Sequence, residues 1–386
     1  DVAVDAGADA SGNGSEAATQ FSIDYDGTSP TVAITSTETS PTNVSPITVT
    51  IIFDEVVTGF DVSDLVIGNG TVTFFGGSGT TYIAAITPTS NGIVTVDIPA
   101  DSAFDTTTNG NDAATQFSIE YDGSVKLSPK AFLQGPILNP STPGLMNDIL
   151  REDGHLPTTS PYTDALTVDP NVFNAGGLSG TGLAADNIVD WIWVELRDSA
   201  DNTNVIVGQS ALLQRDGDIV DLDGTSVMSI NAIASEYFIA LKHRNHSGAM
   251  SQGTFELTAN SSTIVDFTDN GFSTFGTDAQ TILGLGDKAL WAGNVNGDGT
   301  IQYAGAGVLD TSSLLAFILN DSSNFLGVPS WSVTGYNDFD VDMNGTTQFT
   351  GSGVLDTPYI LQNVLSYPGN FLNLSTWTIQ EQLPEN

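Results

Sequence analysis

The sequence predicts a mainly β protein with three parts: an immunoglobulin-like β-sandwich, a second, jelly-roll-like β-sandwich, and a small α-containing module that binds calcium. Three observations predict this fold class. A segment near the N-terminus recurs after 96 residues (113 − 17), alternating β runs lie between residues 188 and 257, and two matching acidic loops near the C-terminus each precede a short helical pattern. A repeat of this length is typical of one sandwich, and paired acidic loops are typical of calcium modules.

The 96-residue repeat defines the N-terminal domains. Residues Ala17–Gly27 read AATQFSIDYDG and recur as AATQFSIEYDG at Ala113–Gly123. We expect one complete sandwich over residues 28–123, because β runs separated by Gly, Asn and Pro turn signals fill this range. The predicted runs are Thr31–Thr35, Ile47–Phe53, Thr71–Phe75, Tyr82–Thr87, Ile93–Ile98 and Gln116–Tyr121.

Residues 1–27 match only the end of that repeat, and we interpret them as the last two strands of a preceding immunoglobulin-like repeat. Two strands cannot bury a core of their own. The sequence therefore predicts a chain cut from a longer array, in which upstream Ig-like repeats are its neighbours. The alternative is that another chain complements the two strands.

The stretch Ile52–Leu65, which reads IFDEVVTGFDVSDL, resembles the bacterial Ig-like repeats of very large surface adhesins. An FxExVxGF-type strand and turn recurs in those repeats. The resemblance covers the predicted sandwich and implies a stalk of stacked domains outside the cell.

Residues 124–290 are expected to form the second, jelly-roll-like β-sandwich, because strong strand patterns with long loops fill this range. The predicted strands are Ile188–Arg197, Val205–Gly208, Ser210–Arg215, Tyr237–His243 and Thr254–Leu257.

Two clusters in this second domain have open interpretations. His243 and His246, with Lys242 and Arg244, form a basic knot that either holds an anionic ligand, or pairs with the nearby acidic run, or is a positively charged strand end. The structural interpretation is favoured, since exposed ion pairs contribute little. The acidic run itself either binds a third calcium ion or forms a solvated hairpin turn; its members are Asp216, Asp218, Asp221 and Asp223.

The C-terminal part, residues 291–386, contains the two acidic loops. They lie 46 residues apart (340 − 294), and the register holds without a gap to residues 326 and 372, with 15 of 33 positions identical. Oxygen-bearing side chains at positions 1, 3 and 5, Gly at position 6 and a later carboxylate are what a Ca²⁺ loop requires. We therefore predict two calcium sites. Their ligands are Asn294, Asn296, Asp298, Thr300, Gln302 and Asp310 in the first, and Asp340, Asp342, Asn344, Thr346, Gln348 and Asp356 in the second.

Both loops depart from the EF-hand in the same way. Position 12 is Gly305 in one copy and Gly351 in the other, and the first following Asp comes at position 17. A Gly-rich insert must therefore loop out before Asp310 or Asp356 returns to the ion. Helical patterns follow at Thr311–Leu319 and Thr357–Leu365. The alternative is a pair of Asn/Asp/Gly turns without metal.

The duplicated loop with its following helix resembles the dockerin and dockerin-like tails of secreted bacterial proteins, which bind cohesins. This resemblance implies a calcium-stabilised module at the end of the chain.

Composition narrows the function classes. The net charge is −38, and all eight Lys and Arg residues lie between residues 126 and 288, so the surface repels nucleic acid and anionic lipid and attracts divalent cations. No apolar run is long enough to span a membrane, and the absence of Cys excludes disulfides and thiol catalysis. No nucleophile elbow or metalloprotease motif is present, so we expect no enzyme.

The segments LMNDILREDGHLP, VDWIWVELRD, SALLQRDGDIVDLDG and LKHRNHSGAMS, with the closing Glu381-Gln-Leu-Pro384, resemble the C-terminal region of many large secreted Bacteroidetes proteins. The resemblance covers residues 130–386 and implies export, by the type IX route, and display outside the cell.

Together these patterns predict a non-catalytic, calcium-stabilised terminal fragment of an extracellular adhesin or cell-surface filament. Such a fragment would contact other cell surfaces or glycans and could self-associate as a homo-oligomer. Two alternatives stay open. One is a dockerin-like or carbohydrate-binding accessory tail of a secreted hydrolase, and the other is an export and anchoring signal region.

Overall fold

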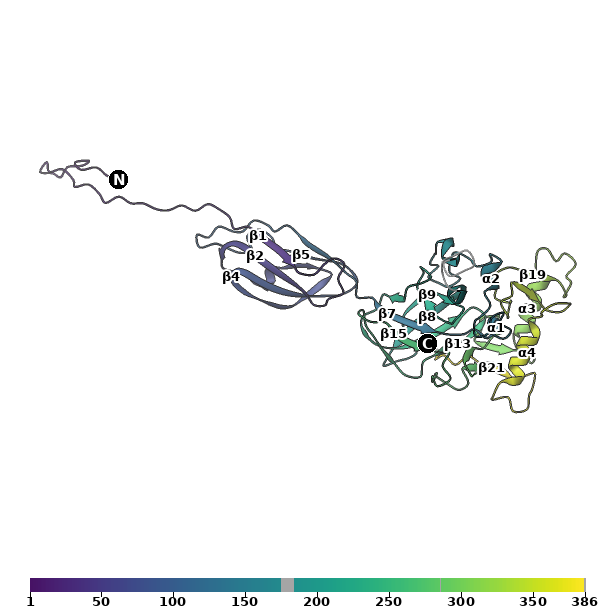
Figure 1. Cartoon of the computed structure of the whole chain (residues 1–386). Helices are drawn as coiled ribbons and strands as arrows, with labels where there is room; N and C mark the ends of the chain where they lie inside the picture. Colours follow the sequence, from purple (N-terminus) through teal and green to yellow (C-terminus); the bar gives the residue numbers. More distant parts are fainter. Residues whose placement is uncertain (175–183, 285, 385–386) are drawn as a thin grey trace. The chain divides into compact units, whose positions relative to one another are not determined.

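The computed structural model describes residues 1–174, 184–284 and 286–384, and the chain divides into two compact units, Asp1–Asp122 and Gly123–Asn386 (Figure 1). The strands form several small, mostly antiparallel sheets, and the α-helices of the described residues are short. The predicted mainly β class is therefore confirmed.

The first unit contains two three-stranded antiparallel sheets. Their inward-facing residues, among them Ile51, Phe53 and Val96, form one buried core. The predicted runs 71–75 and 82–87 fall in one long strand, in which Gly77 and Gly79 have positive φ. The first sheet is β1 (Val32–Ser36), β2 (Ile47–Val57) and β4 (Gly70–Pro88), and the second is β3 (Val66–Gly68), β5 (Gly92–Asp97) and β6 (Phe117–Tyr121); the short helix η1 is Val62–Asp64.

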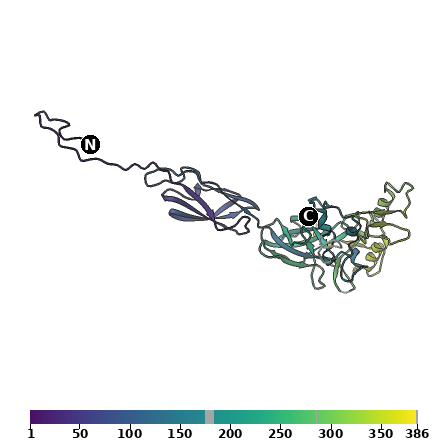
Figure 2. The same ribbon diagram turned by 45° about the horizontal axis from the view of Figure 1, so that its top comes forward.

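Residues 1–27 contain no strand, and Figure 2 draws them as an irregular coil that begins at the N-terminus. Their apolar side chains face solvent. Phe21, Ile23 and Tyr25 are 80%, 77% and 93% exposed, whereas Ile119, the equivalent of Ile23 in the complete repeat, is 4% exposed within β6. The equivalent segment, residues 97–123, contains one complete strand, so residues 1–27 correspond to one strand and its preceding loop instead of the two strands predicted. The apolar residues of this segment are therefore uncovered, whereas their equivalents in β6 pack into a core.

The second unit is built on a six-stranded sheet and a three-stranded sheet whose side chains share one buried core. The central strand of the larger sheet, β8, is buried along almost its whole length on both faces. The larger sheet has the order β10-β9-β8-β12-β13, with β14 also paired to β12: β8 (Ile188–Asp198), β9 (Val205–Gln214), β10 (Ile219–Val220), β12 (Ser235–His243), β13 (His246–Met250) and β14 (Phe255–Leu257).

Shorter elements complete this unit. The three-stranded sheet has the order β11-β7-β15, and β7 and β15 are parallel. The elements are β7 (Val125–Lys130), β11 (Met228–Ile230), β15 (Thr263–Asp266), β16 (Gln280–Ile282), β17 (Lys288–Leu290), α1 (Gln134–Ile137), α2 (Ile149–Glu152), η2 (Pro170–Asn174) and η3 (Ala184–Asp186).

The terminal segment contains helices α3 (Asp310–Leu319) and α4 (Thr357–Ser366), drawn in yellow-green beside each other in Figure 1. Four short strands accompany them: β18 (Thr300–Gln302), β19 (Ser332–Thr334), β20 (Thr346–Gln348) and β21 (Thr378–Gln380). The boundary expected near residue 290 lies inside the second unit. Two buried hydrogen bonds cross this boundary: the side-chain amides of Gln134 and Asn363 each donate one to the other, at 2.7 and 2.8 Å.

Candidate metal centre

The two acidic loops occupy equivalent places in the terminal segment. Each runs into a three-residue strand, β18 or β20, and ends at the start of a helix, α3 or α4. The strands pair across the copies: β18 pairs with β21, which follows the second helix, and β19, which follows the first helix, pairs with β20. The duplication thus extends to residues 334 and 380, beyond the range read from the sequence, and each loop is fixed by the other copy.

The predicted return of the aspartate at position 17 is present in both copies. Asp310 accepts hydrogen bonds from the backbone N–H of Val295 (2.9 Å) and of Gln302 (2.7 Å). Asp356 accepts them from Val341 (2.6 Å) and Gln348 (2.7 Å), the equivalent residues. Each carboxylate therefore closes its loop from the helix side.

The second loop brings three carboxylates together. Asp340, Asp342 and Asp356 each place one oxygen so that all three lie within 4.8 Å of one another. Asp340 and Asp356 are 0% and 1% exposed. Burial first, and the neighbouring carboxylates after it, raise the pKa of Asp340 to about 7 and that of Asp356 well above its ordinary value. These three side chains form a cluster that could hold a metal ion, because like charges this close are costly unless a cation or a proton neutralises them.

The other predicted ligands of the second loop make hydrogen bonds within the turn and to the neighbouring strand. The side-chain oxygen of Asn344 accepts a hydrogen bond from Thr346 N (2.9 Å), and its amide donates to Asp342 (2.9 Å). Gln348 donates its side-chain amide to Ser332 of β19. Asn344 and Thr346 thus shape the turn, and Gln348 ties it to the neighbouring strand.

The first loop has fewer buried charges. Asn294 is 6% exposed, and its side-chain oxygen is buried without a hydrogen-bond partner. An orphaned, buried acceptor at loop position 1 fits a cation ligand. Burial raises the pKa of Asp310 to about 7.

The remaining ligands predicted for the first loop lie nearer the surface. Asp298 is exposed and accepts hydrogen bonds from the side chain of Asn296 (2.8 Å) and from the hydroxyl of Thr300 (2.7 Å). Gln302 donates to Thr378 of β21 (3.1 Å). The first loop thus offers two carboxylates as candidate ligands, whereas the second offers three.

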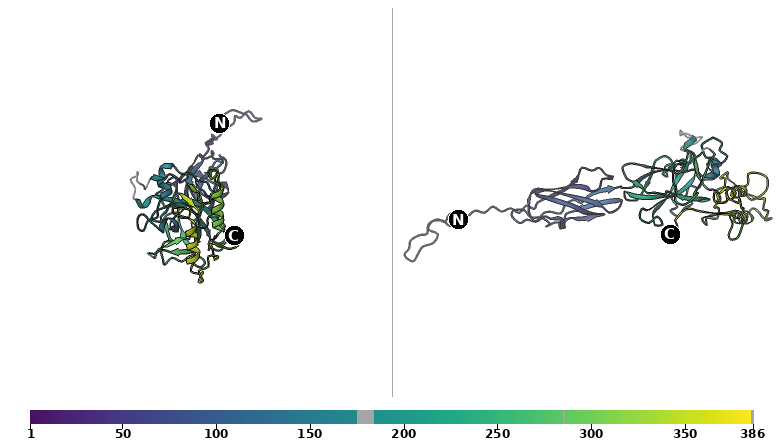
Figure 3. Two further views of the ribbon diagram at one scale, coloured as in Figure 1. Left: turned by 90° about the vertical axis from the view of Figure 1, so that its right-hand side faces the viewer. Right: turned by 90° about the horizontal axis from the view of Figure 1, so that it is seen from below.

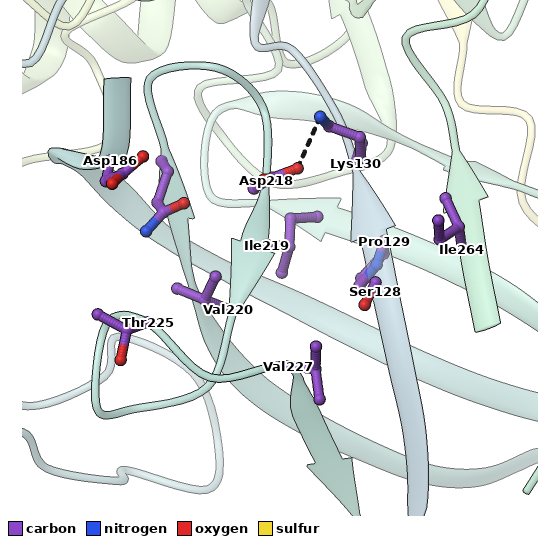
Figure 4. Close-up of a pocket in the computed structure, with 11 residues that line it drawn as sticks. Ser128, Pro129, Lys130, Asp186, Asp218, Ile219, Val220, Thr225, Val227 and Ile264 are labelled. Atoms are coloured by element: carbon purple, nitrogen blue, oxygen red, sulfur yellow. Dashed lines mark ion pairs between the residues drawn. The ribbon is translucent and has the colours of Figure 1, made fainter. Parts of the chain in front are cut away.

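In the described residues the acidic run of the second domain is not among the groups of three close carboxylates, and a third calcium site there remains a hypothesis. Asp218 lies 2.7 Å from the Lys130 ammonium, drawn as a dashed line in Figure 4. Asp221 and Asp223 accept backbone N–H bonds within the turn, and Asp216 accepts one from Asp218 (3.2 Å). Three of the four carboxylates accept hydrogen bonds within the turn and the fourth forms an ion pair, an arrangement that fits the hairpin alternative. Lys130 and Asp218 lie at a hollow of about 470 Å³.

Three of the four side chains of the basic knot are buried, contrary to the expected exposed strand end; Lys242 is 38% exposed and pairs with Glu195 (2.8 Å). His243 and His246 are 6% and 1% exposed, and their Nδ1 atoms lie 3.1 Å apart. The acidic partner is Asp190 of β8, which contacts His243 Nε2 (3.2 Å) and Arg244 Nε (3.0 Å), so the pairing proposed with Asp216–Asp223 is wrong. Asp190 was missed because it lies 53 residues from His243 in the sequence.

This buried network reaches the second loop. Tyr336 donates its hydroxyl to Asp190 (2.7 Å), and Arg244 stacks 4.2 Å from the centre of the Tyr336 ring. Asn245 donates its side-chain amide to the backbone carbonyl of Asp340 (2.7 Å). The strand end therefore positions the acidic loop, which is a structural role.

A second acidic group was not anticipated. Asp26, Glu55 and Asp105 of the first unit place one oxygen each within 4.8 Å of one another. Asp26 is exposed, and Asp105 already accepts hydrogen bonds from Thr107 and Asn109 of its own turn. The 96-residue spacing places Asp9 in register with Asp105, and this signal could have directed attention to the turn.

The comparisons with known proteins concern the first unit. Residues 26–121 match the family model described as a bacterial Ig-like domain, which confirms the predicted immunoglobulin-like domain. Such a domain is consistent with a surface or extracellular protein. A comparison with curated protein sequences found no match. Each helix in the described part of the chain is too short or too polar to cross a membrane.

Proposed function

We propose that this chain is a non-catalytic part of a secreted, cell-surface adhesin or fibre, in which a calcium-bound terminal segment stiffens the end of a stalk of Ig-like domains. The observation that carries the proposal is the cluster of Asp340, Asp342 and Asp356, of which Asp340 and Asp356 are buried. Calcium suits these sites because the ligands are all oxygens, on loops of the spacing that Ca²⁺ uses. The dockerin-like and Bacteroidetes resemblances of residues 130–386 support export and display.

The mechanism is mechanical. Without metal, the three carboxylates must either repel one another or keep protons at neutral pH, so ion binding and ordering of the loop are coupled. With Ca²⁺ bound, the loop fixes the pairing of β19 with β20 and the start of α4. Attachment to other cell surfaces or glycans then acts through a rigid end.

Two measurements test the proposal on the whole chain. Isothermal titration with Ca²⁺ should show two binding events. The double substitution Asp340→Asn and Asp342→Asn should remove the tighter one, while Asp216→Asn, in the hairpin turn of the second unit, should leave both unchanged. Beads coated with the chain should attach to bacterial cells or polysaccharide-coated glass in millimolar Ca²⁺ and detach in EDTA. Calcium binding without attachment above albumin-coated beads would reject the adhesive role and retain the metal site.

A further inference from the structure

The loop after α4 presents a fully exposed apolar pair. Phe371 and Leu372 are 89% and 77% exposed, and Leu374 beside them is 45% exposed. Figures 1 and 3 show the yellow loops of this segment extending outward from the helices. Large apolar side chains grouped in this way on a soluble protein mark interaction surfaces.

The pair is held in a fixed position. Asn370 is 2% exposed, and its side chain donates hydrogen bonds to Val364 O (2.7 Å) and Leu374 O (2.9 Å) and accepts one from Leu374 N (2.9 Å). The loop therefore presents Phe371 and Leu372 as a preorganised knob, and binding need not first order the loop.

An apolar hollow lies next to this knob. It has a volume of about 420 Å³ and is lined by Pro358, Leu361, Gln362, Leu365, Ser366 and Asn373, mostly from α4. A knob and a hollow on one patch meet the requirement of a twofold contact, in which each copy offers the same surface to the other.

The distribution of charge indicates which partner would bind this patch. Residues 357–380 contain no Asp, Glu, Lys or Arg, although the chain has a net charge of −38. Contacts through most other surfaces of two copies would bring carboxylates together, whereas this patch brings none. An uncharged, self-complementary patch on a strongly acidic chain therefore suits a second copy of the same chain.

We propose that two copies of this chain associate through the surface formed by α4 and the loop 370–374, with Phe371 and Leu372 of each copy inserted in the α4 hollow of the other. A buried Phe contributes roughly 150–250 Å². The patch is therefore smaller than the standard interface of about 800 Å² per partner, so the dimer is reversible and depends on concentration.

The first copy of the duplicated segment supplies a matched control. Phe325 and Leu326 are equivalent to Phe371 and Leu372 and are 91% and 88% exposed. Their surroundings differ, because Asp321 stands where the second copy has the uncharged Tyr367. Serine substitutions at either pair remove the same side chains from exposed positions, so neither should change folding.

Sedimentation velocity of the full chain in millimolar Ca²⁺ tests the proposal. The mass should rise from 40.3 kDa towards twice that value with concentration. The double variant Phe371→Ser and Leu372→Ser should raise the concentration for half-association at least about ten-fold, whereas Phe325→Ser and Leu326→Ser should not. A wild-type chain that stays monomeric at every concentration, or equal losses in both variants, would overturn the proposal.

Crosslinking gives a second readout. The chain has no Cys, so Asn373→Cys, at the rim of the hollow, introduces a unique thiol. A short bismaleimide should link this variant into dimers, and Gly327→Cys, the equivalent position in the first copy, should remain monomeric. The result is separable from the proposed function, because calcium titration of the same samples reports the metal sites independently.

Discussion

At the scale of single residues, the closing aspartates have one geometry and different charge environments. Asp310 and Asp356 accept the same pair of backbone N–H bonds in their own loops. Asp356 has Asp340 and Asp342 beside it, whereas Asp310 is served by Asp298, which is exposed. The second loop therefore gathers more negative charge around a cation.

The two sites should consequently differ in affinity. We expect the second site to bind Ca²⁺ more tightly, because affinity in such loops rises with the number of ligand charges. Asp356→Ala should remove the tighter of two binding events and Asp310→Ala the weaker, with on the order of a ten-fold difference in Kd between them. Calorimetric titration of both variants checks the ranking, and equal losses would reject it.

The same burial makes the metal-free protein sensitive to pH. Folding raises the pKa of Asp310 and Asp340 from 3.8 to about 7, so the native state binds more protons than the unfolded state between these values. The free energy of unfolding in EDTA should therefore be highest near pH 4 and fall as the pH rises towards 7, by up to about 1.4 kcal/mol per pH unit for each such carboxyl.

Calcium should reverse this slope. Saturating Ca²⁺ holds these carboxylates ionised in the native state, so protons compete with the metal and stability should rise over the same pH range. Thermal melts in EDTA and in Ca²⁺ across this range give the comparison. Parallel slopes in the two conditions would contradict the assignment of these carboxyls to a metal site.

At the scale of elements, local patterns were predicted well and pairings between distant segments were not. The helical patterns at Thr311–Leu319 and Thr357–Leu365 match α3 and α4 almost residue for residue, because the apolar periodicity lies within the element itself. The pairing of β18 with β21 joins residues 76 or more positions apart through three-residue strands. Strands this short carry too little pattern to be recognised.

Site residues, too, were predicted where they lie close together in the sequence and missed where they lie far apart. The loop spacing located Asp340, Asp342 and Asp356, because these carboxylates lie within one short stretch of sequence. The partner of the His243 and Arg244 knot could not be located, since Asp190 is on another strand of the sheet. Burial of the knot was missed for the same reason, because the end of β12 shows no sign of burial in the sequence until the strand beside it, β8, is known.

Another tertiary link joins α4 to α1. Asn363 and Gln134 exchange two buried amide hydrogen bonds, and Asn363 also donates to Ala292 O (2.7 Å). Asn363→Ala should lower the free energy of unfolding of the second unit by about 1–3 kcal/mol, because it removes the acceptor of the buried Gln134 Nε2 and the donor to Ala292 O. Urea denaturation measures this effect. The exposed neighbour Gln362 provides the control: if Gln362→Ala were equally destabilising, the helix itself would be responsible.

At the scale of the whole molecule, the two units have separate cores. The core of the first unit involves residues 32–121, and both buried clusters of the second unit lie between residues 125 and 379. The segment 291–386 shares its unit with the preceding sandwich, since Met343 belongs to the sandwich core and Asn245 contacts the second loop. A change at the acidic loops should therefore be felt by the sandwich of the second unit.

Calorimetry of the full chain should accordingly show two transitions, because the two units share no core residues, whereas Met343 and Asn245 join the terminal segment to the sandwich of the second unit. Ca²⁺ should raise the Tm of the second unit, since a ligand that binds only the native state stabilises that state by mass action. The exposed group at Asp26 should add a smaller shift to the first unit at most. The variant with Asp340→Asn and Asp342→Asn should lose most of the shift in the second unit alone, and residues 28–123 expressed separately would assign the first transition. If Ca²⁺ still raised the Tm of both transitions in this variant, the dominant metal site would lie outside the terminal loops. A third, independent transition would show that residues 291–386 unfold separately from the sandwich against which they pack.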